Sequence, residues 1–394
     1  MRSRLYLFSL VSALVLFLTT NTARAEAPSP SPEEQKRAAA LVRQLSDRSY
    51  RVRDRAAREL LKMGLAAKKA VEEGTKDTDP EVRKRCADLL PDILQAEFRA
   101  RLDAFRADKD GKKQTDLPGW KLYREIVGSD PEAREFFIEV CTQNAALLEL
   151  LEKEPARAGA AVAERCEQLQ QLFRVPNSGQ IASLRPVDLA PMFLILSEPR
   201  SAVQPQLTYQ LTNLFYQPAI RNVLTAKGST PFKKVILGWM SRQTEDNIMG
   251  HVLSTANNLN MPEVTDLALK VVRNKKVGPQ GHAHGMVILA KNGGKKHIEL
   301  FESFLNDKGS VSSFGIGNKL HGATEVRDVA LAMLVHLTDQ KHTDYDFTFS
   351  RETGYSLLFN APFLGFTTPA ERDKAFKKWQ DWKAKQPRPP KPKK

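Results

Sequence analysis

The sequence of 394 residues predicts an all-α fold, an α-α superhelix in which helix pairs stack on one another. The first observation is a unit that occurs twice between residues 45 and 91, at an offset of 30 residues. The second is that each copy carries apolar residues at helical spacing, and the third is a helix-start signal that recurs along the chain. Repetition at one fixed period is typical of stacked repeats rather than of a globular core.

The two copies are identical at six aligned positions. These are Asp47, Val52, Arg53, Arg55, Ala57 and Leu60 in the first copy and Asp77, Val82, Arg83, Arg85, Ala87 and Leu90 in the second. The apolar stripes are Val52, Ala56, Leu60 and Met63, and then Val82, Cys86, Leu90 and Ile93. Since one helix pair is too small to bury such a stripe, neighbouring pairs are expected to pack together.

The run V-R-x-x-A-A-x-x-L-x-x-x-G from Val52 to Gly64, with Asp47 in the preceding turn, resembles HEAT and HEAT-like repeats. It is most similar to the short variety found in bilin lyases, because the period is shorter than the roughly 40 residues of long HEAT units. The resemblance implies that the turn aspartate and the second-helix arginine form a ladder along the stack. The residues of that ladder would be Asp47, Arg53, Asp77 and Arg83, and Arg327 where the pattern recurs at residues 326–334. The layout of the whole chain also resembles exported bacterial HEAT-repeat proteins.

Helix starts share one pattern, in which a capping residue precedes proline and an acidic residue often follows. The pattern occurs at Ser31-Pro32, Asp79-Pro80, Asp130-Pro131, Thr230-Pro231 and Thr368-Pro369. A capping side chain, proline at the first helical position and an acid in the first turn each favour helix initiation.

These signals divide the chain into seven segments. We expect a signal peptide at 1–25, a linker at 26–32, a HEAT-like module at 33–107, a second linker at 108–116, a helical module at 117–337, an aromatic capping segment with a final helix at 338–384, and a basic disordered tail at 385–394. The Gly/Ser-rich residues 306–322 are expected to be irregular. The aromatic residues at 345–359 alternate, so this segment is expected to be either irregular or a small hairpin turning at 350–354. It either caps the stack or forms a recognition surface.

The N-terminus has the features of a secretory signal peptide. Arg2 and Arg4 precede a 14-residue apolar run, and Ala23-Arg24-Ala25 forms an A-x-A cleavage site. The run is too short for a comfortable membrane span, and no later segment approaches that length. We therefore expect a periplasmic or secreted protein, with an uncleaved N-terminal anchor as the alternative.

The formal net charge of +14 is concentrated at the two ends of the chain. Removing residues 1–25 deletes three arginines and lowers it to +11, and the last twelve residues, Lys383 to Lys394, contain six basic residues and no acid. This tail is either a solvated end or an attachment to anionic envelope polymer. It lacks interleaved aromatic residues, so specific nucleic-acid binding is not expected.

Three cysteines are an odd number for an exported protein. Cys86 replaces Ala56 of the first repeat and is expected to be a buried thiol. Cys141 and Cys166 lie on two predicted helices that flank Pro155, and an antiparallel arrangement of these helices permits a disulfide between them. Two small apolar residues in a helix interface give the same pattern, so both readings stay open.

Catalytic motifs are scarce: no G-x-S-x-G, H-E-x-x-H, C-x-x-C or Walker sequence occurs. One set of polar residues could indicate a metal-dependent hydrolase, namely His282 and His284 together with His297 further along the chain. Two histidines two residues apart do not share a helix face, and the apolar residues that follow predict a helix start exposed to solvent. We therefore expect no cofactor and no metal.

The leading hypothesis is a non-enzymatic scaffold that binds a partner protein in the cell envelope. The expected binding surface is a basic strip on the second helices of the repeats, formed by Arg51, Arg55, Lys84 and Arg85, for which a solvated helix face is the alternative. The rival hypotheses are envelope attachment through the tail and a metal enzyme at His282 and His284.

Overall fold

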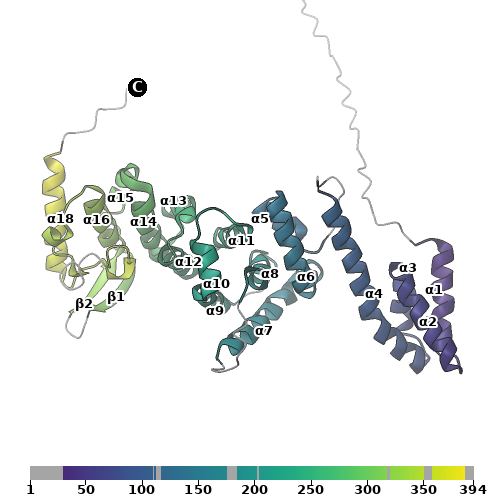
Figure 1. Ribbon diagram of the computed structural model, residues 1–394. Coiled ribbons are helices and arrows are strands. Elements are labelled where there is room, and N and C mark those ends of the chain that lie inside the picture. Colours follow the sequence, from purple (N-terminus) through teal and green to yellow (C-terminus); the bar gives the residue numbers. More distant parts are fainter. Residues whose placement is uncertain are drawn as a thin grey trace, which may run out of the picture. The chain divides into compact units, whose positions relative to one another are not determined.

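A computed structural model describes residues 30–109, 111, 117–174, 184–201, 204–316, 320–349 and 357–386. The chain divides into two compact units, residues 1–117 and residues 118–394. In the described part both units are mainly helical, and one two-stranded sheet is present (Figure 1). The predicted signal peptide lies outside the described residues, as do residues 387–394 of the tail.

In its described residues, unit 1 has four helices that form two consecutive pairs. They are α1 (Pro32–Gln44), α2 (Tyr50–Met63), α3 (Leu65–Gly74) and α4 (Pro80–Ala107). Helix α1 packs on α2 and α3, and α4 packs on α3 and α2, so each helix of one pair contacts its equivalent in the next pair. Ala56 and Cys86, at equivalent positions of the two copies, are both fully buried in the shared core.

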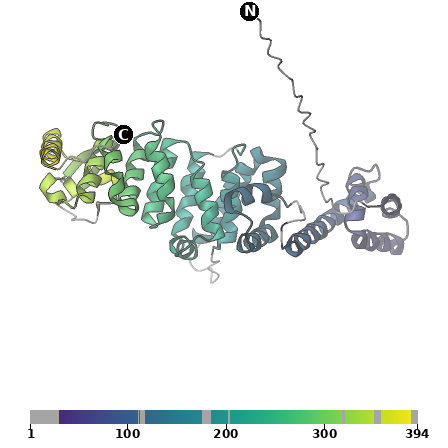
Figure 2. The ribbon, with the colours of Figure 1, turned by 90° about the horizontal axis from the view of Figure 1, so that it is seen from above.

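Unit 2 contains thirteen described α-helices. They are α5 (Trp120–Val127), α6 (Pro131–Lys153), α7 (Pro155–Arg174), α8 (Pro186–Leu196), α9 (Pro205–Asn213), α10 (Pro218–Thr225), α11 (Pro231–Met240), α12 (Asp246–Asn258), α13 (Thr265–Arg273), α14 (Pro279–Gly293), α15 (Ile298–Glu302), α16 (Val326–Leu337) and α18 (Pro369–Ala384). They follow one another in chain order (Figure 2). Packing proceeds from α6 to α8 and α11, and later from α12 to α14, α16 and α18.

The predicted helix starts are confirmed. Ser31 and Thr368 form capping boxes with Glu34 and Glu371, and the side chains of Asp79, Asp130 and Thr230 accept first-turn N–H groups. Each cap satisfies backbone donors that a helix leaves unpaired at its first turn.

The hairpin lies elsewhere than the sequence predicts. Strands β1 (Ser310–Ile316) and β2 (Leu320–Glu325) pair antiparallel within the Gly/Ser-rich segment that is expected to be irregular. The register shifts between Ser310 and Ser312, which is a β-bulge. This bulge places Val311 and Phe314 in the core, so the strand lacks the strict alternation that marks strands in sequences.

The aromatic segment before α18 is folded against the helices. Of the two expectations for it, its described residues follow the irregular one and not the hairpin. Tyr345 ends the 3-10 helix η4 (His342–Tyr345), and Phe349 lies in a helical turn. Tyr345, Phe347 and Phe349 are all buried, and the Phe347 ring stacks on Phe366 at 4.9 Å. The predicted turn at 350–354 lies mostly outside the described residues.

Candidate binding cavity and hairpin surface

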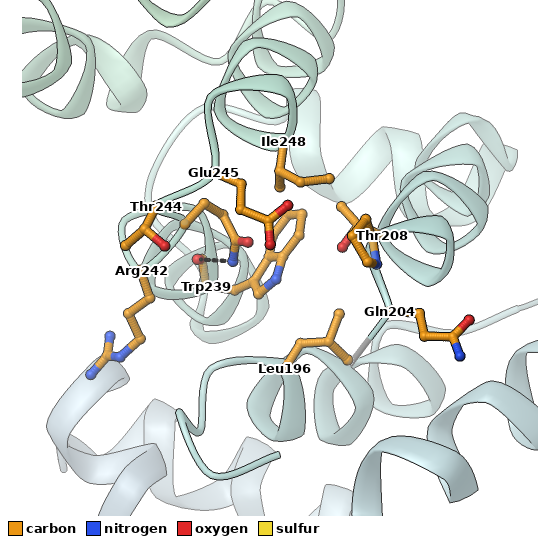
Figure 3. A pocket seen from close by; sticks show the side chains of 10 residues that line it. Leu196, Gln204, Thr208, Trp239, Arg242, Thr244, Glu245 and Ile248 are labelled. Carbon is orange, nitrogen blue, oxygen red and sulfur yellow. Dashed lines mark hydrogen bonds between the residues drawn. The ribbon is translucent and has the colours of Figure 1, made fainter. Parts of the chain in front are cut away.

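A small cavity opens where the ends of four helices meet in unit 2 (Figure 3). Helices α8 and α11 end at this point, and α9 and α12 begin there. The cavity measures about 120 Å³, and the residues that line it are Leu196, Gln204, Pro205, Thr208, Trp239, Arg242, Gln243, Thr244, Glu245 and Ile248. Helix ends carry backbone groups without intrahelical partners, so a cavity among them is polar.

Two of the long polar side chains of this cavity are already engaged. Gln243 donates from Nε2 to the carbonyl of Trp239 at 2.9 Å. Arg242 donates from Nη2 to Glu125 Oε1 at 2.7 Å, and Figure 3 shows its guanidinium pointing away from the cavity. Gln204 and Glu245 precede α9 and α12 as N-cap residues, but neither side chain caps its helix. These two side chains are therefore available to a ligand.

A larger hollow, of about 560 Å³, lies between the hairpin and the start of α18. The buried rings of Phe314 and Phe366 contribute its apolar lining, and Ser313 and His321 are exposed at the hairpin. An apolar floor with polar groups around it is typical of binding sites.

The backbones on either side of this hollow approach each other closely. Ala323 of β2 and Phe366 exchange two backbone hydrogen bonds, of 3.2 and 3.3 Å, as an isolated bridge. A Cβ atom at Gly322 would lie 2.6 Å from the carbonyl oxygen of Phe366, and one at Gly365 would clash with the backbone of Ala323. Glycine at both positions permits this contact.

The hairpin is inserted at a turn that otherwise matches the turns of unit 1. Asp47 Oδ1 accepts the N–H of Ser49 two residues later, and Asp307 Oδ1 accepts the N–H of Gly309 in the same way. The N–H of Val52 then donates to the carbonyl of Ser49, as the N–H of Val326 donates to that of Gly309. In this alignment, residues 310–325 therefore occupy the positions that residues 50 and 51 occupy in the first repeat.

A buried ion pair fixes α18 beside this insertion. Arg372 of α18 donates from Nε to Asp328 Oδ1 at 2.8 Å and from Nη2 to Oδ2 at 3.0 Å, and Nη2 also donates to the carbonyl of Ala323. Asp328 is fully buried, and burial raises its pKa to about 6, more than the hydrogen bonds from Arg372 lower it. The sequence signal for this pair is weak, because its partners are far apart along the chain.

The ladder residues of unit 1 make the same contacts in both copies. Arg53 Nη1 donates to the carbonyl of Asp47 at 2.7 Å, and Arg83 Nη1 donates to the carbonyl of Asp77 at 2.7 Å. Each arginine thus holds the backbone of its own turn. The contact between the copies is made by Arg53 Nε and Glu81 Oε1, at 3.9 Å.

The third ladder arginine, Arg327, is engaged differently. Its Nε donates to Glu325 Oε2 at 2.6 Å, and its guanidinium lies 5.6 Å from the centroid of the Phe376 ring. Its backbone N–H donates to the carbonyl of Asp307 at 2.9 Å, which ties the helix to the turn before the hairpin.

The predicted basic strip is only partly unpaired. Arg51, Arg55 and Lys84 are exposed, but Arg85 is half-buried and forms an ion pair with Glu81 at 2.7 Å. Exposed Asp88 and Asp92 follow on α4, so the second copy adds negative charge to the same helix.

His282 and His284 lie in α14, near the helix start that the sequence predicts. Both side chains are buried, so the prediction of a solvent-exposed turn is wrong. His282 Nε2 lies 3.1 Å from the carbonyl oxygen of Asn274, and its ring contacts Phe304 edge-on. Burial lowers the pKa of His284 to about 4, and the neighbouring charge of His251 adds to this shift. Buried His297 stacks on Phe301. Among the described residues, no group of three His, Cys, Asp or Glu could hold a metal ion.

The three cysteines are separate buried thiols. Cys86 is fully buried, as predicted. Cys141 on α6 and Cys166 on α7 are not joined either, so the structure does not contain the disulfide that their spacing permits. Both side chains are fully buried, which fits the alternative of small apolar residues in a helix interface.

In the part of the chain that the structure describes, the protein is mainly helical, with an inserted hairpin, a polar cavity at helix ends and a hollow beside the hairpin. No protein-family model matches the sequence, and no curated protein or solved structure matches it either. Within the described ranges, no helix is both long and apolar enough to cross a membrane.

Proposed function

We propose that the protein is an exported, non-enzymatic scaffold of HEAT-like helical repeats that binds a partner protein. The repeated turn supports the repeat architecture, because Asp47 and Arg53 make the same contacts as Asp77 and Arg83. The basic residues, apolar run and A-x-A site at the N-terminus support export.

The observation that carries the binding function is the insertion of β1 and β2 into a repeat turn. Insertions in repeat proteins project from one face of the stack, and that face is often the binding face. Here the insertion adds exposed Ser313 and His321 and borders a hollow with an apolar floor. An apolar anchor site surrounded by polar groups is the arrangement that dominates binding energy at protein interfaces.

Binding through the basic tail is the second candidate. Six basic residues among the last twelve could hold anionic envelope polymer. Such binding would weaken steeply with salt, whereas a contact with an apolar centre would not.

The experiment compares three variants of the protein beginning at Glu26 in capture from envelope extracts. The first replaces residues 310–325 by the dipeptide Tyr-Arg of the first repeat, the second is Ser313→Arg on the intact hairpin, and the third ends at Gln386. The proposal predicts that the first two lose the same captured protein and that the third retains it. Circular dichroism must show unchanged helix content, and the point variant keeps the test valid should the replacement unfold.

Capture that disappears only in the variant ending at Gln386, and only at low salt, would favour the tail. Capture that is unchanged in both hairpin variants would contradict the proposed binding surface.

A further inference from the structure

Phe366 forms a third strand of one residue beside the hairpin. It exchanges backbone hydrogen bonds with Ala323 in both directions, at 3.2 and 3.3 Å. In antiparallel sheets the N–H and C=O groups of one residue face the same edge of its strand, and successive residues alternate between the two edges. Because both groups of Ala323 face Phe366, those of His321, two residues earlier on β2, face the same edge. Within the described residues, the backbone of His321 has no hydrogen-bond partner on that edge.

The chain leaves this edge because α18 begins. Thr368 follows Phe366 by two residues, so it would lie opposite His321 in a longer third strand. Its backbone is still extended, with φ −133° and ψ 153°, but it is the N-cap residue of α18. Its N–H donates to Glu371 Oε2 at 3.3 Å, and its carbonyl accepts from the N–H of Arg372 at 3.3 Å. Both groups that a third strand would offer to His321 are therefore used by the helix.

The hollow of about 560 Å³ lies where this third strand stops. Its lining includes His321 and Gly322 of β2, and Thr367 and Thr368 of the chain that turns away. One residue of a strand takes up about 160 Å³, from a rise of ~3.3 Å, a strand spacing of ~4.8 Å and a sheet spacing of ~10 Å. The hollow therefore has the volume of roughly three to four residues of extended chain.

The lining of the hollow fits an uncharged extended peptide. Of the described residues around it, Arg372 alone carries a permanent charge, and its guanidinium is already bound to Asp328. The buried rings of Phe314 and Phe366 form the floor. A charged ligand would find no free counter-charge among these residues. A peptide can pair its backbone with His321 and place an apolar side chain on the two rings.

We infer that the hollow binds a short extended peptide of a partner protein, which adds to β2 in line with Phe366. The peptide backbone bonds to the N–H and C=O of His321, and an apolar side chain contacts Phe314 and Phe366. In strand addition, main-chain hydrogen bonds give affinity and pockets for alternate side chains give specificity. This inference rests on the proposed partner-binding function and specifies the form in which the partner is recognised.

The test selects ligands from a phage-displayed library of linear heptapeptides on the protein beginning at Glu26. Two variants then separate backbone recognition from side-chain recognition. His321→Pro removes the edge N–H, and the hairpin is retained because that group does not pair with β1. His321→Ala keeps the N–H and removes the imidazole. The selected peptides are expected to bind His321→Pro about tenfold more weakly and His321→Ala with unchanged affinity.

Gly315→Pro is the matched control, because Gly315 lies opposite His321 and its N–H faces the other edge of the hairpin. It should keep the affinity, and urea denaturation checks that both proline variants remain folded. Methylation of the peptide gives a measurement that does not depend on the fold of a variant. N-methyl groups on one set of alternate residues should abolish binding, and those on the other set should preserve it, since a strand uses every second N–H along one edge.

The absence of any enriched peptide, equal binding to His321→Pro, or equal loss with both methylation patterns would overturn the inference. A dimer of the protein that is lost in His321→Pro would overturn it in favour of a second copy as the occupant. Peptides that bind only the variant ending at Gln386 would assign the hollow to the tail instead.

The selection needs no natural partner, so its outcome is independent of capture from envelope extracts. Capture that is lost on replacement of residues 310–325, while the peptides fail these tests, would remove this inference and leave the proposed function. Peptides that pass the tests, while capture is unaffected by the replacement, would contradict the proposed function and leave the peptide site.

Discussion

Replacing Arg372 by methionine should destabilise the C-terminal part of unit 2 more than any exposed charge on α18 does. The guanidinium makes two hydrogen bonds to Asp328, one to the carbonyl of Ala323 and an ion pair with Glu325 at 3.4 Å. Methionine retains much of the volume but leaves the Asp328 carboxylate buried without its cation. Removing one partner of a buried pair costs about 3 to 5 kcal/mol.

The cost should depend on pH in a definite direction. Burial raises the folded-state pKa of Asp328 from 3.8 to about 6. At ~1.4 kcal/mol per pH unit, this shift corresponds to a change of about 3 kcal/mol in the free energy of unfolding between low and high pH. A carboxyl whose pKa is higher in the folded state than in the unfolded state stabilises the fold while it is protonated. This contribution is fully present below the pKa of the unfolded state and is lost as the pH rises through the pKa of the folded state. Without Arg372 the pKa of Asp328 rises further, so the carboxyl is protonated at pH 5. The destabilisation by Arg372→Met should therefore be larger at pH 8 than at pH 5.

The assay is urea denaturation followed by tryptophan fluorescence at both pH values, because Trp379 and Trp382 lie on α18. The matched control is Lys374→Met on the same helix, which removes an ion pair between the more exposed side chains of Lys374 and Asp346 at 2.8 Å. That pair should contribute at most about 1 kcal/mol.

The double variant Asp328→Leu with Arg372→Met should recover most of the loss, because it leaves no buried charge unpaired. Equal effects of Arg372→Met and Lys374→Met, or an effect that is the same at both pH values, would refute the reasoning.

Three further predictions address the backbone, the thiols and the N-terminus. Gly365→Ala should lower the free energy of unfolding by about 1 to 3 kcal/mol in urea denaturation, because the new Cβ would overlap the backbone of Ala323; unchanged stability would contradict the close approach. Burial raises the pKa of Cys86 and of Cys166 to about 11, so a thiol reagent at pH 8 should react slowly with the folded protein and with three thiols per chain in denaturant. One reactive thiol in denaturant would instead indicate a disulfide. If the signal peptide is cleaved as proposed, mass spectrometry of the protein purified from its own cells should find Glu26 as its first residue, and an intact residue 1 would contradict cleavage.

Helix starts were predictable because their signals are local. Ser31, Asp79 and Thr368 each bond to backbone groups within the next three residues, so the sequence window contains all the partners. The buried positions of unit 1 were predictable for a related reason, since helical spacing alone determines that Ala56 and Cys86 face the same core.

The hairpin and the cavity depend on partners that sequence windows do not contain. The bulge between Ser310 and Ser312 breaks the alternation of β1, and the pairing that holds the strand is with the backbone of β2. Trp239 has the sequence signal of an apolar core residue, and its place beside the cavity depends on where the ends of four helices meet. The exposure expected for His282 and His284 failed similarly, because neighbouring elements cover the start of α14.

Site-specific photo-crosslinking from the hairpin tests the central claim, that the inserted hairpin contacts a partner protein. A photoreactive residue at Ser313 should give one dominant protein adduct in envelope extracts, and the same residue at Lys36, exposed on α1, should give none. The same adducts from both positions, or no adduct from Ser313, would contradict the account.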